Sequence, residues 1–123
     1  MANPNIVNVT SILGKTDYDT DVATSETTLV DTVATDKILK INTIIAANID
    51  GTNDADITVF VALANGSVAY HLAKTVTVPA DSSLVIISKD TSFYLEEGLR
   101  IRANASAAGD ISLMCSYEEM DDA

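Results

Sequence analysis

Apolar and polar residues alternate with a period of two along much of the chain. Three runs show this most clearly, at residues 39–50, 57–63 and 111–118. In the first run Leu39 and Ile41 fall on one face, and Lys40 and Asn42 fall on the other. Such alternation is typical of a strand with one buried face. Further strands are predicted at residues 6–13, 27–33, 68–78, 83–88 and 99–105.

Turn motifs separate these runs. Asn65-Gly66 stands between two β-rich runs, and both residues tolerate positive φ, which favours a hairpin. Residues 107–110 indicate a second hairpin connection. The best helix candidate, residues 116–123, is too short and too acidic to be stable alone. Roughly eight short strands at intervals of about 8–12 residues therefore predict an all-β protein, an antiparallel β-sandwich or jelly roll with little helix.

The chain is short enough to form a single β-sandwich domain over residues 1–123. Residues 1–16 are expected to form an extended N-terminal arm, which either packs on its own domain or reaches a neighbouring subunit. The polar residues 17–25 are predicted to be a loop that joins this segment to the main body. The apolar faces of the runs predict a core that contains Ile41, Ile45, Ile57, Val59, Leu84, Ile101, Ile111 and Leu113.

Charge excludes several classes of partner. The chain has 18 acidic and 7 basic residues, a formal net charge of −11. A surface this acidic repels phosphates, so we expect no direct binding to nucleic acid and none to anionic membranes. No apolar run approaches the ~18 residues that a membrane span needs. The first residues have neither a basic region nor an apolar stretch, so no secretory signal is predicted.

Candidate catalytic and metal-binding residues are few. His71 is the only histidine and lies in a predicted strand, where a packed or exposed histidine is favoured over a catalytic base. Cys115 is the only cysteine and lies on an apolar face, which favours a core residue. The acidic runs 17–21 and 50–56 are oxygen-rich enough to consider calcium, but ordinary turns use Asp and Asn in the same way. We therefore predict no catalytic residue, no cofactor and no metal site.

Several segments resemble small virion structural proteins of marine tailed phages, such as cyanophages and pelagiphages. The resemblance begins with Met1-Ala2-Asn3-Pro4-Asn5-Ile6-Val7-Asn8-Val9-Thr10-Ser11-Ile12. It continues through Asn48-Ile49-Asp50-Gly51-Thr52-Asn53 and Val78-Pro79-Ala80-Asp81-Ser82-Ser83-Leu84-Val85, and it ends with Ser116-Tyr117-Glu118-Glu119. At Gly98-Leu99 the chain departs from the family, which more often has Gly-Asp there. The resemblance implies a non-enzymatic β-sandwich protein of the virion that is synthesised in the cytoplasm of the bacterial host.

The resemblance leaves the place in the virion open. Capsid decoration is the first expectation, and the alternatives are a neck, tail or fibre-attachment protein, or a ligand- or glycan-binding module displayed on the virion. The expected partners are other virion proteins, the major capsid protein first, and copies of this chain. The N-terminal segment has apolar side chains on both faces of an extended stretch, more than a strand facing water needs. It therefore predicts an interface made of Ile6, Val7, Val9, Ile12 and Leu13.

Overall fold

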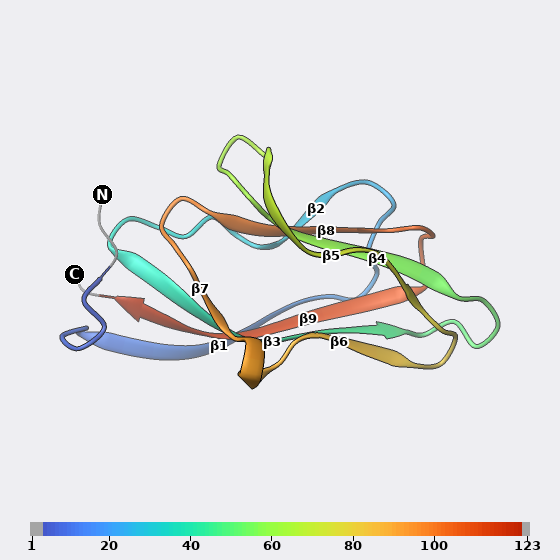
Figure 1. Ribbon diagram of the computed structural model, residues 1–123, viewed down its shortest axis with the longest axis horizontal. Coiled ribbons are helices and arrows are strands. Elements are labelled where there is room, and N and C mark those ends of the chain that lie inside the picture. The colour runs from blue at the N-terminus through green and yellow to red at the C-terminus, as the bar shows by residue number, and fades with distance from the viewer. Residues whose placement is uncertain (1–3, 122–123) are drawn as a thin grey trace.

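Among residues 4–121, which the structure describes, nine strands form two antiparallel sheets (Figure 1). The structure is a computed structural model. The first sheet contains β1 (Ser11–Asp19), β3 (Lys37–Asn48), β6 (Ser83–Ile87), β7 (Phe93–Leu95) and β9 (Ile111–Asp121). The second sheet contains β2 (Thr27–Val30), β4 (Ala55–Ala62), β5 (Val68–Val78) and β8 (Arg100–Ala105). The only helix of the described residues is a short 3₁₀ turn, η1 (Lys89–Thr91).

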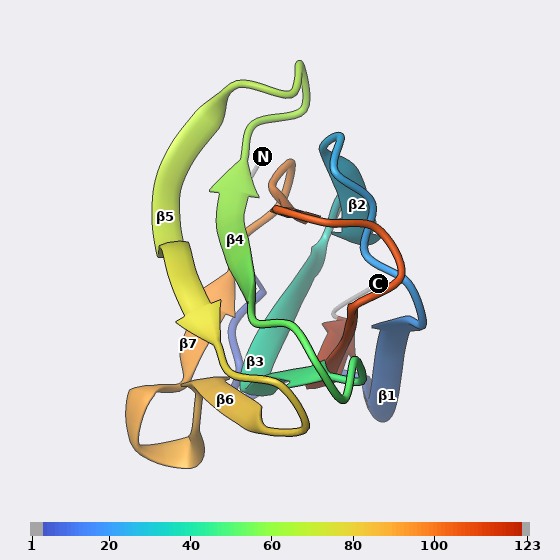
Figure 2. The same ribbon diagram turned by 90° about the vertical axis from the view of Figure 1, so that its right-hand side faces the viewer.

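The strand order is that of a jelly roll. The first sheet runs β1-β9-β3-β6, with β7 also paired to β3, and the second runs β2-β8-β4-β5. The chain crosses between the two sheets after β1, β2, β3, β5, β7 and β8, whereas β4 and β5 pair with each other in the second sheet (Figure 2). Without β7 this is the arrangement of an eight-stranded, double-sheet jelly roll. The all-β sandwich prediction is confirmed, and the strand that the sequence did not predict is the three-residue β7.

Apolar side chains from both sheets fill the space between them. Six of the eight predicted core residues are buried there: Ile41, Ile57, Val59, Ile101, Ile111 and Leu113. The prediction for Ile45 is wrong, because Ile45 is only partly buried and is not part of the core, whereas Leu84 is partly buried and packs against the core. Leu84 lies opposite Ala46 on the inner face, but it belongs to the edge strand β6 and is covered less completely.

A bulge in β3 explains why Ile45 is not in the core. The pairing of β3 with β9 shifts register between Ile41 and Thr43. One extra residue at a bulge reverses the face on which all later side chains lie. As a result Ile44 is fully buried and Ile45 lies on the outer face of the sheet. The same reversal leaves Ile49 59% exposed.

The weak helix candidate 116–123 forms no helix where the structure describes it, because residues 116–121 continue strand β9; residues 122 and 123 lie outside the described residues. Two expectations for the N-terminal part of the chain are corrected. The predicted loop 17–25 begins too early, because residues 17–19 belong to β1. The predicted first strand, 6–13, overlaps β1 only at its end, since β1 begins at Ser11. An edge strand exposed on both faces has no reason to alternate apolar and polar residues, so its sequence resembles a loop.

Candidate docking surface on strand β1

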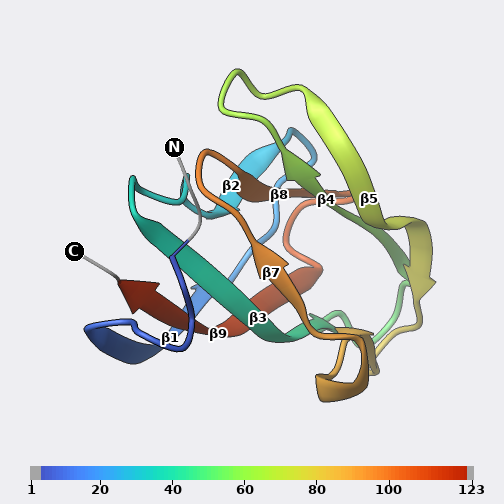
Figure 3. The same cartoon turned by 60° about the vertical axis from the view of Figure 1, so that its left-hand side comes forward.

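Strand β1 forms one edge of the first sheet. It pairs with β9 alone among the described strands, from Ser11 opposite Asp121 to Asp19 opposite Leu113, with no shift in register. Figure 3 shows β1 beside β9 at the edge of the first sheet. Of the expected arm 1–16, residues 11–16 are therefore part of the sheet in this structure. The strand's second edge has no partner within residues 4–121.

Most side chains of β1 are exposed, on both faces of the sheet. Ile12 and Leu13 point to opposite faces, and they are 55% and 51% exposed. Tyr18, at the other end of the strand, is 71% exposed. A strand that served only the core of this domain would bury one of its faces. Apolar side chains on both faces indicate a surface that a second molecule could cover.

The structure places the predicted interface residues at the surface. Ile6 and Val7 are 47% and 85% exposed, and Val9 is partly buried. With Ile12 and Leu13 they form a continuous stretch of chain that leads into β1, so their role as an interface stays a prediction. Sequence reasoning missed Tyr18, which fell within the predicted polar loop. Its signal was an aromatic residue between two aspartates, Asp17 and Asp19.

Besides the backbone pairing, side-chain and terminal contacts hold β1 and the segment before it against β9. The Thr10 backbone N–H and hydroxyl both donate to the carbonyl of Asp121, each at 2.8 Å. The Lys15 ammonium lies 2.8 Å from a Glu119 carboxylate oxygen. The hydrogen bond from Lys15 is the largest cause of the lowered pKa of Glu119. Lys37, whose ammonium lies 3.5 Å from the other Glu119 oxygen, lowers this pKa further. The backbone and the charged side chains of β1 are thus held in defined positions.

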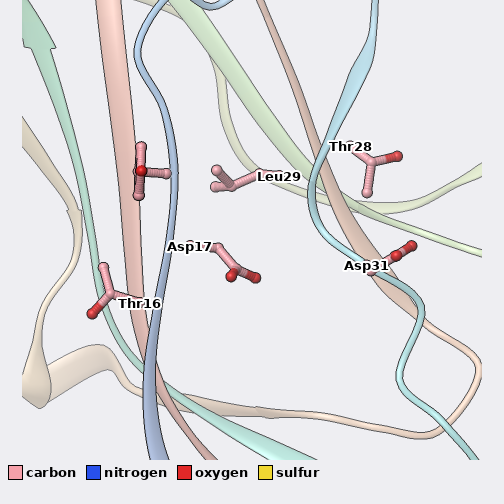
Figure 4. A pocket seen from close by; sticks show the side chains of 6 residues that line it. Thr16, Asp17, Thr28, Leu29 and Asp31 are labelled. Carbon is pink, nitrogen blue, oxygen red and sulfur yellow. The ribbon is translucent and has the colours of Figure 1, made fainter.

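The inner face of β1 borders an open groove between the edges of the two sheets. The groove has a volume of about 400 Å³ and is lined by Thr16, Asp17, Tyr18, Thr28, Leu29 and Asp31. Figure 4 shows the Asp17 side chain between β1 and β2, and Thr16 on the other side of the β1 ribbon. The Tyr117 hydroxyl donates to Asp17 at 2.9 Å. Burial, and then this carboxylate, raise the pKa of Tyr117, so the phenol stays protonated.

His71 and Cys115, the two residues considered for catalysis, lie in strands and pack against other side chains. His71 lies in β5 with its ring 5.7 Å from that of Phe60. Cys115 is fully buried, and burial raises the pKa of its thiol to about 12. This agrees with a core residue, because the thiolate is the reactive form.

The carboxylates of the acidic turns accept hydrogen bonds from backbone N–H groups, within their own turn or in a neighbouring loop. Asp50 accepts hydrogen bonds from the N–H groups of Thr52, at 2.8 Å, and Asn53, at 3.3 Å. Asp21 accepts one from Gly109 at 2.6 Å. Within the described residues no group of three or more His, Cys, Asp or Glu is arranged to hold a metal ion. No helix of residues 4–121 is long and apolar enough to cross a membrane.

No protein-family model matches the sequence, and no curated protein sequence matches it. Several solved structures have a similar course of the chain. One is titled as Bacillus endospore appendages, a family of disulfide-linked pili. Its TM-score is 0.49, and it is 16% identical over 92% of this chain and 90% of that one. A chain of infectious bursal disease virus, Gx strain, has a TM-score of 0.48 and 11% identity over 91% of this chain, which spans about a third (32%) of the viral chain. A pentameric capsid protein isolated from metagenomic phage sequences has a TM-score of 0.39 and 16% identity over 86% of this chain and 60% of that one. Likeness at this level is shared by proteins of unrelated function.

Proposed function

We propose that this chain is a non-enzymatic structural protein of a tailed-phage virion, and that it decorates the capsid. The observation that carries the proposal is the exposed N-terminal surface: a nine-residue edge strand, β1, preceded by the apolar residues Ile6 and Val7. The segment resemblance to marine phage proteins supports it, because it extends over nearly the whole chain. The jelly roll is compatible with it, since viral capsid domains are among those that use this fold.

The proposed partner is the major capsid protein, with copies of this chain as additional partners. Extended segments bind neighbouring subunits by adding main-chain hydrogen bonds at a sheet edge and by placing alternate side chains in pockets. Ile6 and Val7 precede β1 and keep large exposed apolar surfaces, so they are suited to such pockets. An acidic body would be directed to a capsid surface of opposite charge.

A binding assay with matched variants tests the proposal. Capsids assembled without this chain are mixed with the purified protein, and the bound fraction is measured after sedimentation. The variant Ile6→Thr/Val7→Thr removes apolar surface while keeping β-branched side chains. The control variant Ile49→Thr/Val85→Thr makes the same kind of change at residues that are 59% and 56% exposed elsewhere on the surface.

We expect the first variant to lose most of its binding and the control to bind like the unmodified chain. Equal binding by all three proteins would refute the role of the N-terminal segment. Failure of the unmodified chain to bind capsids would refute capsid decoration. In that case, binding to a purified tail or fibre, or to immobilised glycans, would support one of the other virion roles.

A further inference from the structure

The five edge strands among the described residues, which are β1, β2, β5, β6 and the three-residue β7, differ in how they are protected against pairing. A sheet edge presents unpaired N–H and C=O groups, and proteins protect it with short strands, bulges and charges. Strand β2 has four residues and β6 has five, and both pair with a shift in register. Strand β5 is longer, but its pairing with β4 shifts in three places and Thr75 has a φ of 52°. Among the described edges only β1, with nine residues in continuous register, is neither short nor interrupted by a bulge, and charges alone protect it, at Lys15, Asp17 and Asp19.

The pattern of side chains on β1 is complementary to itself. The register with β9 places Lys15 and Asp17 on the inner face, opposite Tyr117 and Cys115. Gly14 and Tyr18 share the outer face. The position where a Cβ would stand on Gly14 has no other atom within 4 Å, so the surface there is open. A positive charge, a negative charge, an open glycine and an exposed aromatic ring thus lie within five residues of one strand.

We propose that β1 pairs antiparallel with β1 of a second copy of this chain, about a two-fold axis at Thr16. This register places Lys15 of each copy opposite Asp17 of the other, and Gly14 of each opposite Tyr18 of the other. Opposite charges in directly facing positions stabilise a sheet, and so do facing threonines, which Thr16 supplies at the axis. An aromatic ring laid over a facing glycine covers its exposed backbone. The two first sheets then become one continuous sheet across the dimer.

Charge selects this register over its neighbours. Two residues that face each other across the pairing must have their side chains on the same face of the combined sheet. The two-fold axis of a symmetric pairing must therefore pass through a pair of identical residues, one from each copy, so the neighbouring registers have their axes at Lys15 and at Asp17. An axis at Lys15 would place two lysines opposite each other, and an axis at Asp17 would place two aspartates opposite each other. Like charges in facing positions are destabilising. The alternation of charge along β1 therefore favours one register of pairing over its two neighbours.

The charged groups are already in position before pairing. Glu119 holds the Lys15 ammonium at 2.8 Å, and the Lys15 side chain is still 44% exposed. The Tyr117 hydroxyl holds Asp17 at 2.9 Å. Groups that are fixed in advance lose less conformational freedom on association. The formal charge of −11 on each copy opposes association, so the measurements belong at about 0.15 M salt, where repulsion is screened beyond about 8 Å.

This inference deepens the proposed assembly role and rests on it, because it names the chain itself as one partner. It is tested by sedimentation velocity with two charge-reversed variants, Lys15→Asp and Asp17→Lys. Each variant alone would face like charges across the axis and should be monomeric. An equimolar mixture restores both opposite-charge pairs and should form a dimer with one copy of each. Circular dichroism and melting curves establish that both variants are folded.

A cross-link tests the register independently of charge. The two Thr16 residues would face each other at the axis, with Cα atoms about 4.5–5.5 Å apart, a separation that a disulfide spans. Thr16→Cys should therefore form a cross-linked dimer under mild oxidation. The control is Val85→Cys, on the edge strand β6, where Val85 is 56% exposed. The native Cys115 is buried and should not take part.

We expect the unmodified chain to dimerise, the mixed charge variants to recover the dimer, and Thr16→Cys to cross-link many-fold more than Val85→Cys. A chain that stays monomeric up to about 1 mM overturns the proposal, as do equal yields from the two cysteine variants. Protection of β1 by another virion protein alone, with no dimer, overturns it as well. A monomer that still binds capsids would refute only this pairing, whereas a dimer that binds no capsid would refute only the capsid role.

Discussion

The bulge in β3 makes a sharp prediction about two neighbouring residues, Ile44 and Ile45. Simple alternation from Ile41 places Ile45 in the core, whereas the structure buries Ile44 completely and leaves Ile45 partly exposed on the outer face. Truncation of each to alanine removes the same atoms from adjacent positions. The comparison therefore tests the register of the longest strand of the sandwich.

The expected magnitudes follow from burial. Replacing Ile44 by Ala removes about three buried carbon groups at about 0.8 kcal/mol each, or about 2.4 kcal/mol. The cavity left in a closed core raises the total to about 3–4 kcal/mol. Ile45 lies between Val85 and Met114 on the partly exposed face, where solvent and side chains can fill the space. Ile45→Ala should therefore cost about 1–1.5 kcal/mol.

Urea unfolding followed by far-UV circular dichroism measures both values. The two variants should share the slope of the unmodified chain and differ in midpoint. The measurement is best made at a dilute and fixed protein concentration, because any dimer adds to apparent stability. A loss for Ile45→Ala that equals or exceeds the loss for Ile44→Ala would mean that the bulge is absent and that strand β3 is in the other register.

Three further predictions address buried and charged groups. The Cys115 thiol should not react with iodoacetamide at pH 8 in the folded chain and should react in urea, since its pKa is raised to about 12 by burial; reaction of the folded chain would contradict this. Asn48 is 3% exposed and donates hydrogen bonds of 2.9 Å and 3.0 Å to two backbone carbonyls. Asn48→Leu should therefore lower the free energy of unfolding, measured in urea, by about 2–4 kcal/mol. An unchanged free energy of unfolding would contradict this. Glu119 has a lowered pKa, so the stability from its contact with Lys15 is present above the unfolded value near 4.5 and is lost as pH falls through the folded value. Lys15→Met should therefore destabilise the chain by about 0.5–1 kcal/mol at pH 7 and by nothing well below pH 4, and a difference that grows at low pH would contradict it.

The alternating runs predicted most of the sandwich because burial of one face requires it. Residues 68–78 were predicted as a strand with the bounds that β5 has in the structure. Ile57, Val59, Ile111 and Leu113 were predicted as core, and each is buried. The strands β4 and β9, which contain these four residues, lie in the interior of the sheets and bury one face, so their apolar residues recur with a period of two.

The strand and core predictions were wrong where a strand buries neither face or where a bulge interrupts the alternation. The bulge after Ile41 inserts one residue into β3, and no residue type at that position indicates a bulge. The prediction therefore assigned the inner and outer faces of β3 the wrong way round from Thr43 onward. Strand β1 has no covered face, so its polar half resembled a loop. Strand β7 has only three residues, too few for a period to be seen.

The candidate surface was predicted in part. The sequence indicated Ile6, Val7, Ile12 and Leu13 because apolar residues occupied both faces of one stretch, and the structure places all four at the surface. It did not indicate Tyr18, because the pairing of residues 17–19 with β9 joins segments about a hundred residues apart. Only the folded topology brings Tyr18 into the same edge as Ile12.

A density map of the intact virion tests the central claim most directly. If the chain decorates the capsid, its two-sheet sandwich fits density on the outer surface of the capsid, with Ile6, Val7 and β1 against a neighbouring subunit. Density for this chain only at the neck, the tail or a fibre would contradict capsid decoration. Absence of the chain from purified virions would contradict the structural role itself.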